Sequence, residues 1–91
     1  LRGYVVKSAG DQFIINLGSN QGVVTGTKFN VIEEQAPIKY GGKLLHASPK
    51  TVAVFEVVTV EPDLSYVRVI NTGRPLKIND KVQEKIEEIA L

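Results

Sequence analysis

The run Thr51–Val60 limits the fold more strongly than any other part of this sequence. Seven of its ten residues are valine or threonine, and β-branched residues favour extended backbone. Apart from Glu56, both faces of the run are apolar, which is typical of a long strand that bends from one part of a small barrel to another. This run therefore predicts a β-sheet fold.

Shorter segments with alternating polar and apolar residues predict further strands. In Gln12–Leu17, the apolar side chains of Phe13, Ile15 and Leu17 fall on one face. A short turn separates this segment from the strand before it, which predicts a hairpin. The predicted strands are 3–8, 12–17, 27–34, 51–60 and 65–70.

The densest group of turn residues lies between the second and third predicted strands. Gly18, Gly22 and Gly26 fall within nine positions, which implies backbone sites where a Cβ atom would clash. We assign all three a structural role in this turn. If Gly22 and Gly26 have positive φ, valine at either position should destabilise the domain by ~1 kcal/mol or more.

The segment 35–50 has no clear period and contains two prolines and two adjacent glycines. It predicts a long loop, or a loose hairpin that turns near residues 40–43. Loops of this length in compact domains are commonly functional or mobile. Its basic and aromatic side chains are our candidate partner-binding residues: Lys39, Tyr40, Lys43 and His46.

Two patterns mark the end of the chain. Residues 77–82 can be aligned with 24–29, with Asn79 and Gly26 at the matching turn position, which suggests two similar turns that each begin a strand. Val82, Ile86 and Ile89 then follow helical spacing. We expect a barrel domain over 1–82, and a tail over 83–91 that is either a short helix or the start of a linker.

Size and charge exclude several classes of protein. With 91 residues the chain is one domain, and its 43% hydrophobic content argues against disorder. The net charge is +1. Residues 1–50 hold six basic and three acidic side chains, which is more typical of an ordinary surface than of a phosphate-binding groove. Nucleic acid is therefore not the expected partner.

The chain also lacks the residues that most enzyme sites require. It has no cysteine and a single histidine, His46, so neither a nucleophile–histidine pair nor a zinc site is expected. We predict no catalytic residue, cofactor, metal or small-molecule substrate. Glu56 and Arg68 are predicted to form an ion pair across neighbouring strands. No apolar run is long enough to cross a membrane, and the absence of methionine predicts a piece of a longer protein.

One stretch resembles a known family. The segment 16–23, followed by Gly26, Phe29 and Val31, is similar to the C-terminal domain of the periplasmic flagellar assembly protein T and to related domains of bacterial envelope proteins. The similarity extends over residues 3 to about 82. Thr27 and Asn79 depart from it, because they stand where such barrels have an acidic residue and a glycine. The resemblance implies a small β-barrel module that assembles with other envelope proteins and catalyses nothing.

Together these features predict an all-β domain, a small SH3-like barrel of five to seven strands. The first functional hypothesis is a non-enzymatic assembly module of a bacterial envelope protein, in the periplasm or at the envelope, with a role in flagellar basal-body assembly. Its partners would be other protein subunits. A cytoplasmic location stays open. The alternatives are a nucleic-acid-binding SH3-like barrel and an accessory domain of a larger enzyme.

Overall fold

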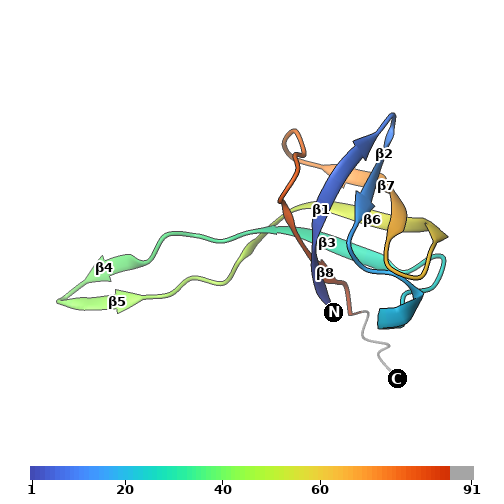
Figure 1. Ribbon diagram of the computed structural model, residues 1–91. Helices are drawn as coiled ribbons and strands as arrows, with labels where there is room; N and C mark the ends of the chain where they lie inside the picture. The colour runs from blue at the N-terminus through green and yellow to red at the C-terminus, as the bar shows by residue number, and fades with distance from the viewer. Residues whose placement is uncertain (87–91) are drawn as a thin grey trace, which may run out of the picture.

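The computed structural model describes residues 1–86, whose regular secondary structure is almost entirely β-strand (Figure 1). A single 3₁₀ turn, η1, lies at Ser19–Gln21. The strands are β1 (Arg2–Ala9), β2 (Gln12–Ile15), β3 (Lys28–Glu33), β4 (Ile38–Tyr40), β5 (Lys43–Leu45), β6 (Lys50–Val60), β7 (Ser65–Thr72) and β8 (Lys81–Glu84).

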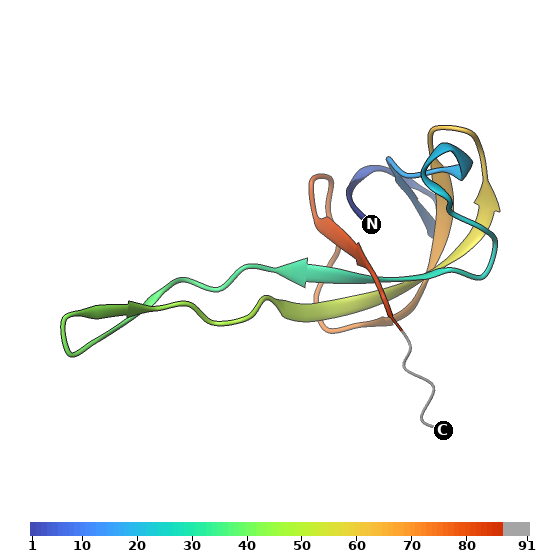
Figure 2. The same ribbon diagram turned by 90° about the horizontal axis from the view of Figure 1, so that it is seen from below.

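Six of these strands close into a barrel in the order β1-β2-β7-β6-β3-β8 (Figures 1 and 2). Every neighbouring pair is antiparallel, and β8 closes the barrel by pairing with both β1 and β3. Closure leaves the barrel no free strand edge. The all-β prediction and the small SH3-like barrel are confirmed.

The core fills the barrel with side chains from alternating strand positions. Phe29 and Phe55 lie opposite each other on β3 and β6 and are fully buried. The ring of Phe13 stacks on that of Phe55, with ring centroids 5.7 Å apart. The other buried core residues are Val5, Ile15, Leu17, Val23, Val31, Ala53, Val57, Val67 and Val82.

On the outer wall of the barrel, Arg68 and Glu56 lie directly opposite each other on β7 and β6. Arg68 donates two hydrogen bonds to Glu56 Oε1, the shorter being 2.7 Å. The predicted cross-strand ion pair is therefore present.

Residues 34–49, between β3 and β6, form a long arm that extends from the barrel (Figure 2). Its outer part is the hairpin of β4 and β5, which turns through Gly41 and Gly42 with φ of 57° and 77°. Two successive residues with positive φ form a type I′ turn, the usual choice for a two-residue hairpin. Of the two predicted forms, the hairpin that turns near residues 40–43 is the one observed.

The glycines before β3 serve different purposes. Gly22 and Gly26 have φ of 88° and 90°, a conformation that glycine adopts without strain. Gly18 has an extended backbone with φ of −139°. It lies against the β6–β7 turn, where the N–H of Ser19 donates to the carbonyl of Glu61 at 2.9 Å.

The two turns matched in the sequence have the same backbone structure. Gly26 and Asn79 both have positive φ, at 90° and 75°. The Gly26 N–H donates to Val57 O at 2.9 Å, and the Asn79 N–H donates to Val5 O at 2.8 Å. In each turn the next residue accepts a hydrogen bond back from that same valine, at 2.8 Å. The barrel therefore contains an internal structural repeat, and each copy leads into one of two paired strands.

This repeat predicts how Gly26 responds to substitution. Gly26→Val should cost about 1–2 kcal/mol of the free energy of unfolding, because a β-branched residue is strained at positive φ. Gly26→Asn should cost clearly less, because Asn79 already adopts that conformation in the equivalent turn. Urea denaturation of the two variants measures the difference. Equal costs would contradict the equivalence of the turns.

Residues 81–84 form β8, so a helix over the tail 83–91 is wrong at residues 83 and 84. Val82 is buried between β1 and β3, whereas Ile86, expected on the same helical face, is 84% exposed. Closing the barrel provides two ladders of backbone hydrogen bonds, and this outweighs a helical spacing of three apolar residues. The rest of the predicted helix, 87–91, lies outside the described residues. The predicted division at residue 82 stays a prediction, although β8 continues to Glu84.

Candidate functional site

All four predicted partner-binding residues lie on the arm, and all are exposed. Lys39 and Tyr40 belong to β4 and Lys43 to β5, while His46 follows β5. Residues directly opposite in an antiparallel pair share a face, so Tyr40 and Lys43 lie on one face of the hairpin. Lys39 lies on the other. The arm thus brings the four residues to one element but not to one face.

The arm also exposes three apolar side chains that the prediction missed. Ile38, Leu44 and Leu45 are 55%, 56% and 47% exposed. Ile38 and Leu45 are opposite each other and share a face with Tyr40, which is 76% exposed. The sequence signal was the Gly41-Gly42 pair. Pairing the residues on either side of it as a hairpin would have placed Ile38, Tyr40 and Leu45 on one face.

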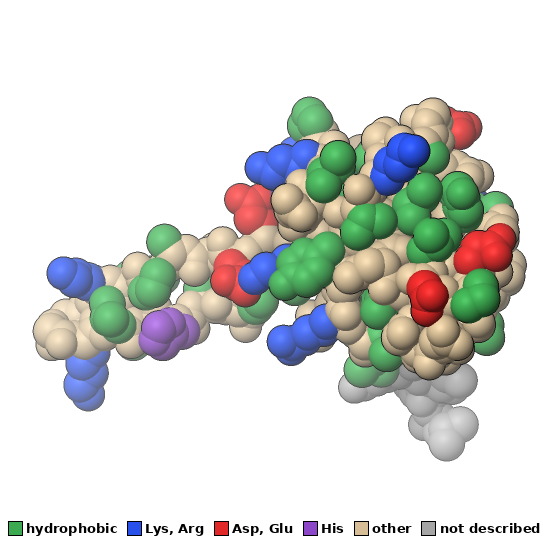
Figure 3. Space-filling model, in the orientation of Figure 1, with side chains coloured by type: hydrophobic (Ala, Val, Ile, Leu, Met, Phe, Trp, Pro, Cys, Tyr) green, Lys and Arg blue, Asp and Glu red, His purple; other side chains and the backbone are tan. Residues whose placement is uncertain are grey.

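No part of the arm is covered by the barrel. Every residue from 33 to 51 is exposed, and Figure 3 shows hydrophobic side chains and His46 along the arm, with basic side chains toward its outer end. Exposed apolar side chains grouped on one element usually mark a binding surface. The arm is therefore the candidate functional site.

The arm differs in charge from the barrel. Residues 35–50, from the base of the arm to the first residue of β6, hold three lysines and one histidine and no aspartate or glutamate, while Glu34 at the base is paired with Lys81. The rest of the chain has eight basic and ten acidic residues. An element of one charge sign favours partners of the opposite sign through complementary potential.

Ion pairs fix the base of the arm to the barrel. Arg74, in the segment after β7, donates hydrogen bonds to Glu33 at 3.0 Å and to both carboxylate oxygens of Asp80 at 3.1 Å. These two carboxylates, Asp80 above all, raise the pKa of the Arg74 guanidinium. On the other side, Lys81 bonds Glu34 at 2.6 Å and lowers the pKa of that carboxyl.

Asp80 holds this arrangement together from a buried position, with its side chain only 5% exposed. Burial on its own raises the pKa of Asp80, but the hydrogen bonds from Arg74 and from the backbone N–H of Lys77 outweigh burial and leave the pKa below its usual value. The charged form of Asp80 is therefore favoured by the fold.

This lowered pKa predicts a pH dependence of stability. Because the pKa of Asp80 is lower in the folded than in the unfolded chain, its contribution is complete above the unfolded value of about 3.9. It is lost as the pH falls from there through the folded pKa. The difference in unfolding free energy between the wild type and Asp80→Asn should thus be constant near pH 6 and shrink below pH 4. Urea melts of both proteins test this, and a constant difference down to pH 2 would contradict it.

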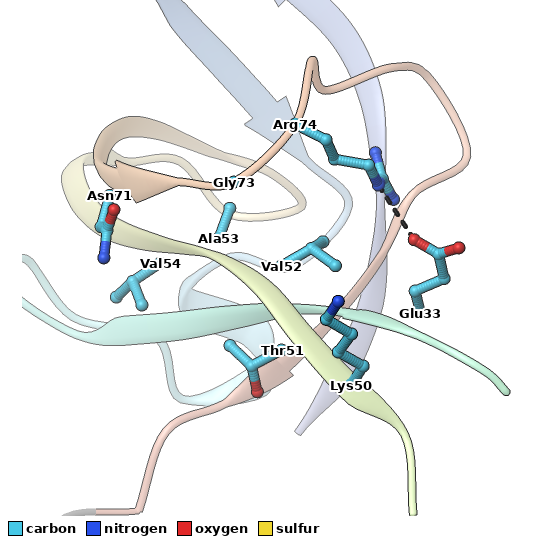
Figure 4. A pocket seen from close by; sticks show the side chains of 9 residues that line it. All are labelled: Glu33, Lys50, Thr51, Val52, Ala53, Val54, Asn71, Gly73 and Arg74. Atoms are coloured by element: carbon cyan, nitrogen blue, oxygen red, sulfur yellow. Dashed lines mark hydrogen bonds and ion pairs between the residues drawn. The ribbon is translucent and has the colours of Figure 1, made fainter.

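A groove of about 330 Å³ lies where the arm joins the barrel (Figure 4). Val54 and Asn71 lie at one end, with the Arg74–Glu33 ion pair at the other. Within residues 1–86, β7 pairs with β6 as far as Ala53, and the Gly73 N–H then donates to Val52 O at 2.8 Å. The groove therefore begins where β6 runs beyond β7 toward the arm.

The described residues show no arrangement suited to metal binding. Among residues 1–86, no three His, Asp or Glu side chains come together to hold an ion. No helix in this part of the chain is long and apolar enough to span a membrane.

The family model of the flagellar assembly protein T C-terminal domain matches residues 10–83. The chain belongs to this family. The match begins just before β2 and ends within β8, so it includes the arm, and it confirms the resemblance seen in the sequence. By its description the family is the C-terminal domain of a flagellar assembly protein, and it is not an enzyme family. A comparison with curated proteins found no match.

The two departures from the expected family pattern keep the chemistry of the turns. Thr27 stands where an acidic residue was expected, and its hydroxyl accepts a hydrogen bond from the Val24 N–H at 3.3 Å. Asp80 accepts from the Lys77 N–H at 2.9 Å in the equivalent position. Asn79 has the positive φ expected of a glycine. The two turns therefore keep the same backbone structure despite both departures.

Proposed function

We propose that this domain is a non-enzymatic protein-interaction module of a bacterial envelope assembly, and that the arm is its contact surface. Membership of the flagellar assembly protein T family supports a place in flagellar basal-body assembly. The same membership supports a location in the periplasm or at the envelope. The partners are other protein subunits of that assembly.

The observation that carries the proposal is the complete exposure of the arm. A two-stranded hairpin is marginally stable at best in water, and ordering residues 33–51 costs conformational entropy that no core contact offsets. Yet the hairpin presents Ile38, Tyr40 and Leu45 together on one face. A second protein that covers this face would stabilise the arm by burying its apolar area.

Replacing the arm tests this function. Residues 34–49 are exchanged for Asn-Gly, which joins Glu33 to Lys50, two residues that already pair across β3 and β6. In the intact protein, this variant should reduce swimming motility and the fraction of flagellated cells to the level of a deletion strain. The isolated domain should keep its melting temperature within about 5 °C.

Asp11→Ala, in the exposed β1–β2 turn outside the arm, is the control variant and should leave motility unchanged. Wild-type motility of the armless variant at normal protein levels would refute the proposed contact surface. A large fall in its melting temperature would instead show that the arm is part of the folding unit.

The lysines of the arm favour one alternative, a nucleic-acid-binding barrel. Three lysines that each neutralise a phosphate would give binding whose logarithm falls with the logarithm of salt concentration with a slope of about −2 to −3. Titrating the domain with labelled single-stranded and double-stranded oligonucleotides at several salt concentrations separates the two functions. Binding with that slope would favour the alternative.

A further inference from the structure

The arm has two free backbone edges, and they differ at the base. The outer edge of β4 continues into Glu33 and Glu34, whose carboxylates are bound by Arg74 and Lys81. The outer edge of β5 instead continues into the start of β6 and the groove beside Gly73. Unpaired N–H and C=O groups along a strand edge are a template for another strand. Hollows lie at both inner ends, but the one beside the β5 edge is lined by Lys50 and Gly73, whereas those beside the β4 edge include Glu34 and its partner Lys81.

The hairpin register shows which groups this edge presents. Tyr40 and Lys43 flank the two-residue turn and pair with each other, so they share the first hydrogen-bonded position. The next pair, Lys39 and Leu44, is of the non-hydrogen-bonded kind. The N–H and C=O of Leu44 therefore point away from β4, toward the free edge.

The groove can receive the end of an added strand. Gly73 has no side chain, and a Cβ atom built there would meet only Val52 O, at the ordinary contact distance of 3.5 Å. Gly73 lines the groove, so a larger side chain at this position adds bulk there without a backbone clash at its Cβ.

The charge of the β5 edge and of the groove indicates which kind of added strand would bind there. From Lys43 to Phe55 the chain has two lysines and His46 but no acidic residue. The one carboxylate that lines the groove, Glu33, is bound by Arg74. A second copy of the arm has the same charge and would be repelled. A lipid surface would leave the edge N–H and C=O groups unpaired in hydrocarbon.

From these observations we propose that an acidic, extended segment of a partner protein adds as a strand along β5 and the start of β6, with its end in the groove beside Gly73. This inference rests on the proposed function and names the partner chemistry of its contact surface. The segment would alternate acidic and apolar residues, so that its carboxylates lie on one face of the added strand, where they can pair with Lys43 or with Lys50. An added strand of eight residues spans about 26 Å.

A model peptide of four Glu-Val repeats, with both ends blocked, tests this mode of binding on the isotope-labelled domain. The peptide should shift the amide signals of Leu44, Thr51 and Gly73, and it should protect the outward N–H of Leu44 from hydrogen exchange. Gly73→Leu and Leu44→Pro should each weaken its binding at least tenfold, since they fill the groove and remove the outward N–H. Gly73→Ala, and Thr25→Leu at a distant exposed turn, should not.

Several results would overturn the proposal. These are no binding at low salt, equal binding of the matching Lys-Val peptide, or shifts without amide protection. Protection of Lys39 rather than Leu44 would place the strand on the other edge. Sedimentation as a dimer, with protected Leu44 amides and no peptide, would identify a second copy as the occupant.

Motility assays distinguish a failure of strand addition from a failure of the proposed function on which it rests. If the armless protein fails to support motility but Gly73→Leu and Leu44→Pro support it fully, the added strand is wrong and the function stands. If the armless protein supports motility, the function itself is wrong. If both edge variants fail and Gly73→Ala succeeds, both proposals are supported.

Discussion

Gly18→Ala is expected to destabilise the domain by about 3 kcal/mol or more, the largest effect of any single added methyl group in the chain. The backbone of Gly18 is extended, so the cost is not one of conformation. A Cβ atom there would overlap the carbonyl oxygen of Glu61 and lie 2.6 Å from Pro62 O and 2.7 Å from Leu64 N. All three are backbone atoms of the β6–β7 turn, which cannot move aside as a flexible side chain could.

The hydrogen bonds across this contact add to the cost. The N–H groups of Ser19 and Asn20 donate to the carbonyls of Glu61 and Pro62 at 2.9 and 3.0 Å, and separating the two turns would weaken both bonds. Gly73→Ala is the matched control, because its Cβ would make only an ordinary contact. Urea denaturation measures both variants. A loss below 1 kcal/mol for Gly18→Ala would show that the two turns do not pack as closely as described.

Phe55→Ala should cost about 3–5 kcal/mol, the usual range when a fully buried phenylalanine is truncated. Phe55 is completely buried at the centre of β6, opposite Phe29 and stacked against Phe13. Its neighbours belong to strands held in closed ladders, so they cannot collapse to fill the cavity. A domain of this size has a small reserve of stability, and the variant should be partly unfolded at 37 °C.

Tyr40→Ala is the matched aromatic control. Tyr40 is 76% exposed at the arm tip, so its truncation should change the free energy of unfolding by no more than about 0.5 kcal/mol. Thermal and urea melts followed by circular dichroism compare the pair. Similar losses for both variants would mean that the arm folds cooperatively with the barrel.

The barrel strands could be predicted because burial leaves a pattern in the sequence. Thr51–Val60 and Gln12–Leu17 each lie against the core. In Gln12–Leu17 the alternating apolar residues Phe13, Ile15 and Leu17 indicated the inward face, and in Thr51–Val60 the many β-branched residues indicated a strand. The matched turns were detectable for a similar reason, because Gly26 and Asn79 meet the same demand for positive φ. These strands and turns could thus be predicted from short segments of the sequence.

β8 and the arm could not be predicted in the same way. The spacing of Val82 and Ile86 fits a helix, and only pairing with two strands distant in sequence makes Val82 part of a barrel. The arm contacts no core, so no alternation marks an inward face, and Ile38 and Leu44 remained unnoticed. Its candidate residues were found by composition, while their division between two faces depends on the register around Gly41 and Gly42.

The arm enters and leaves the barrel through one residue pair, Glu33 and Lys50. Its length is therefore independent of the barrel, and it can change without altering any core contact. Each residue added to both strands would move the hairpin tip outward by about 3.3 Å. Adding one to each strand would turn the apolar face to the opposite side, and adding two would restore it. The spacing between this domain and a neighbour bound at the tip is thus set by the number of residues between Glu33 and Lys50.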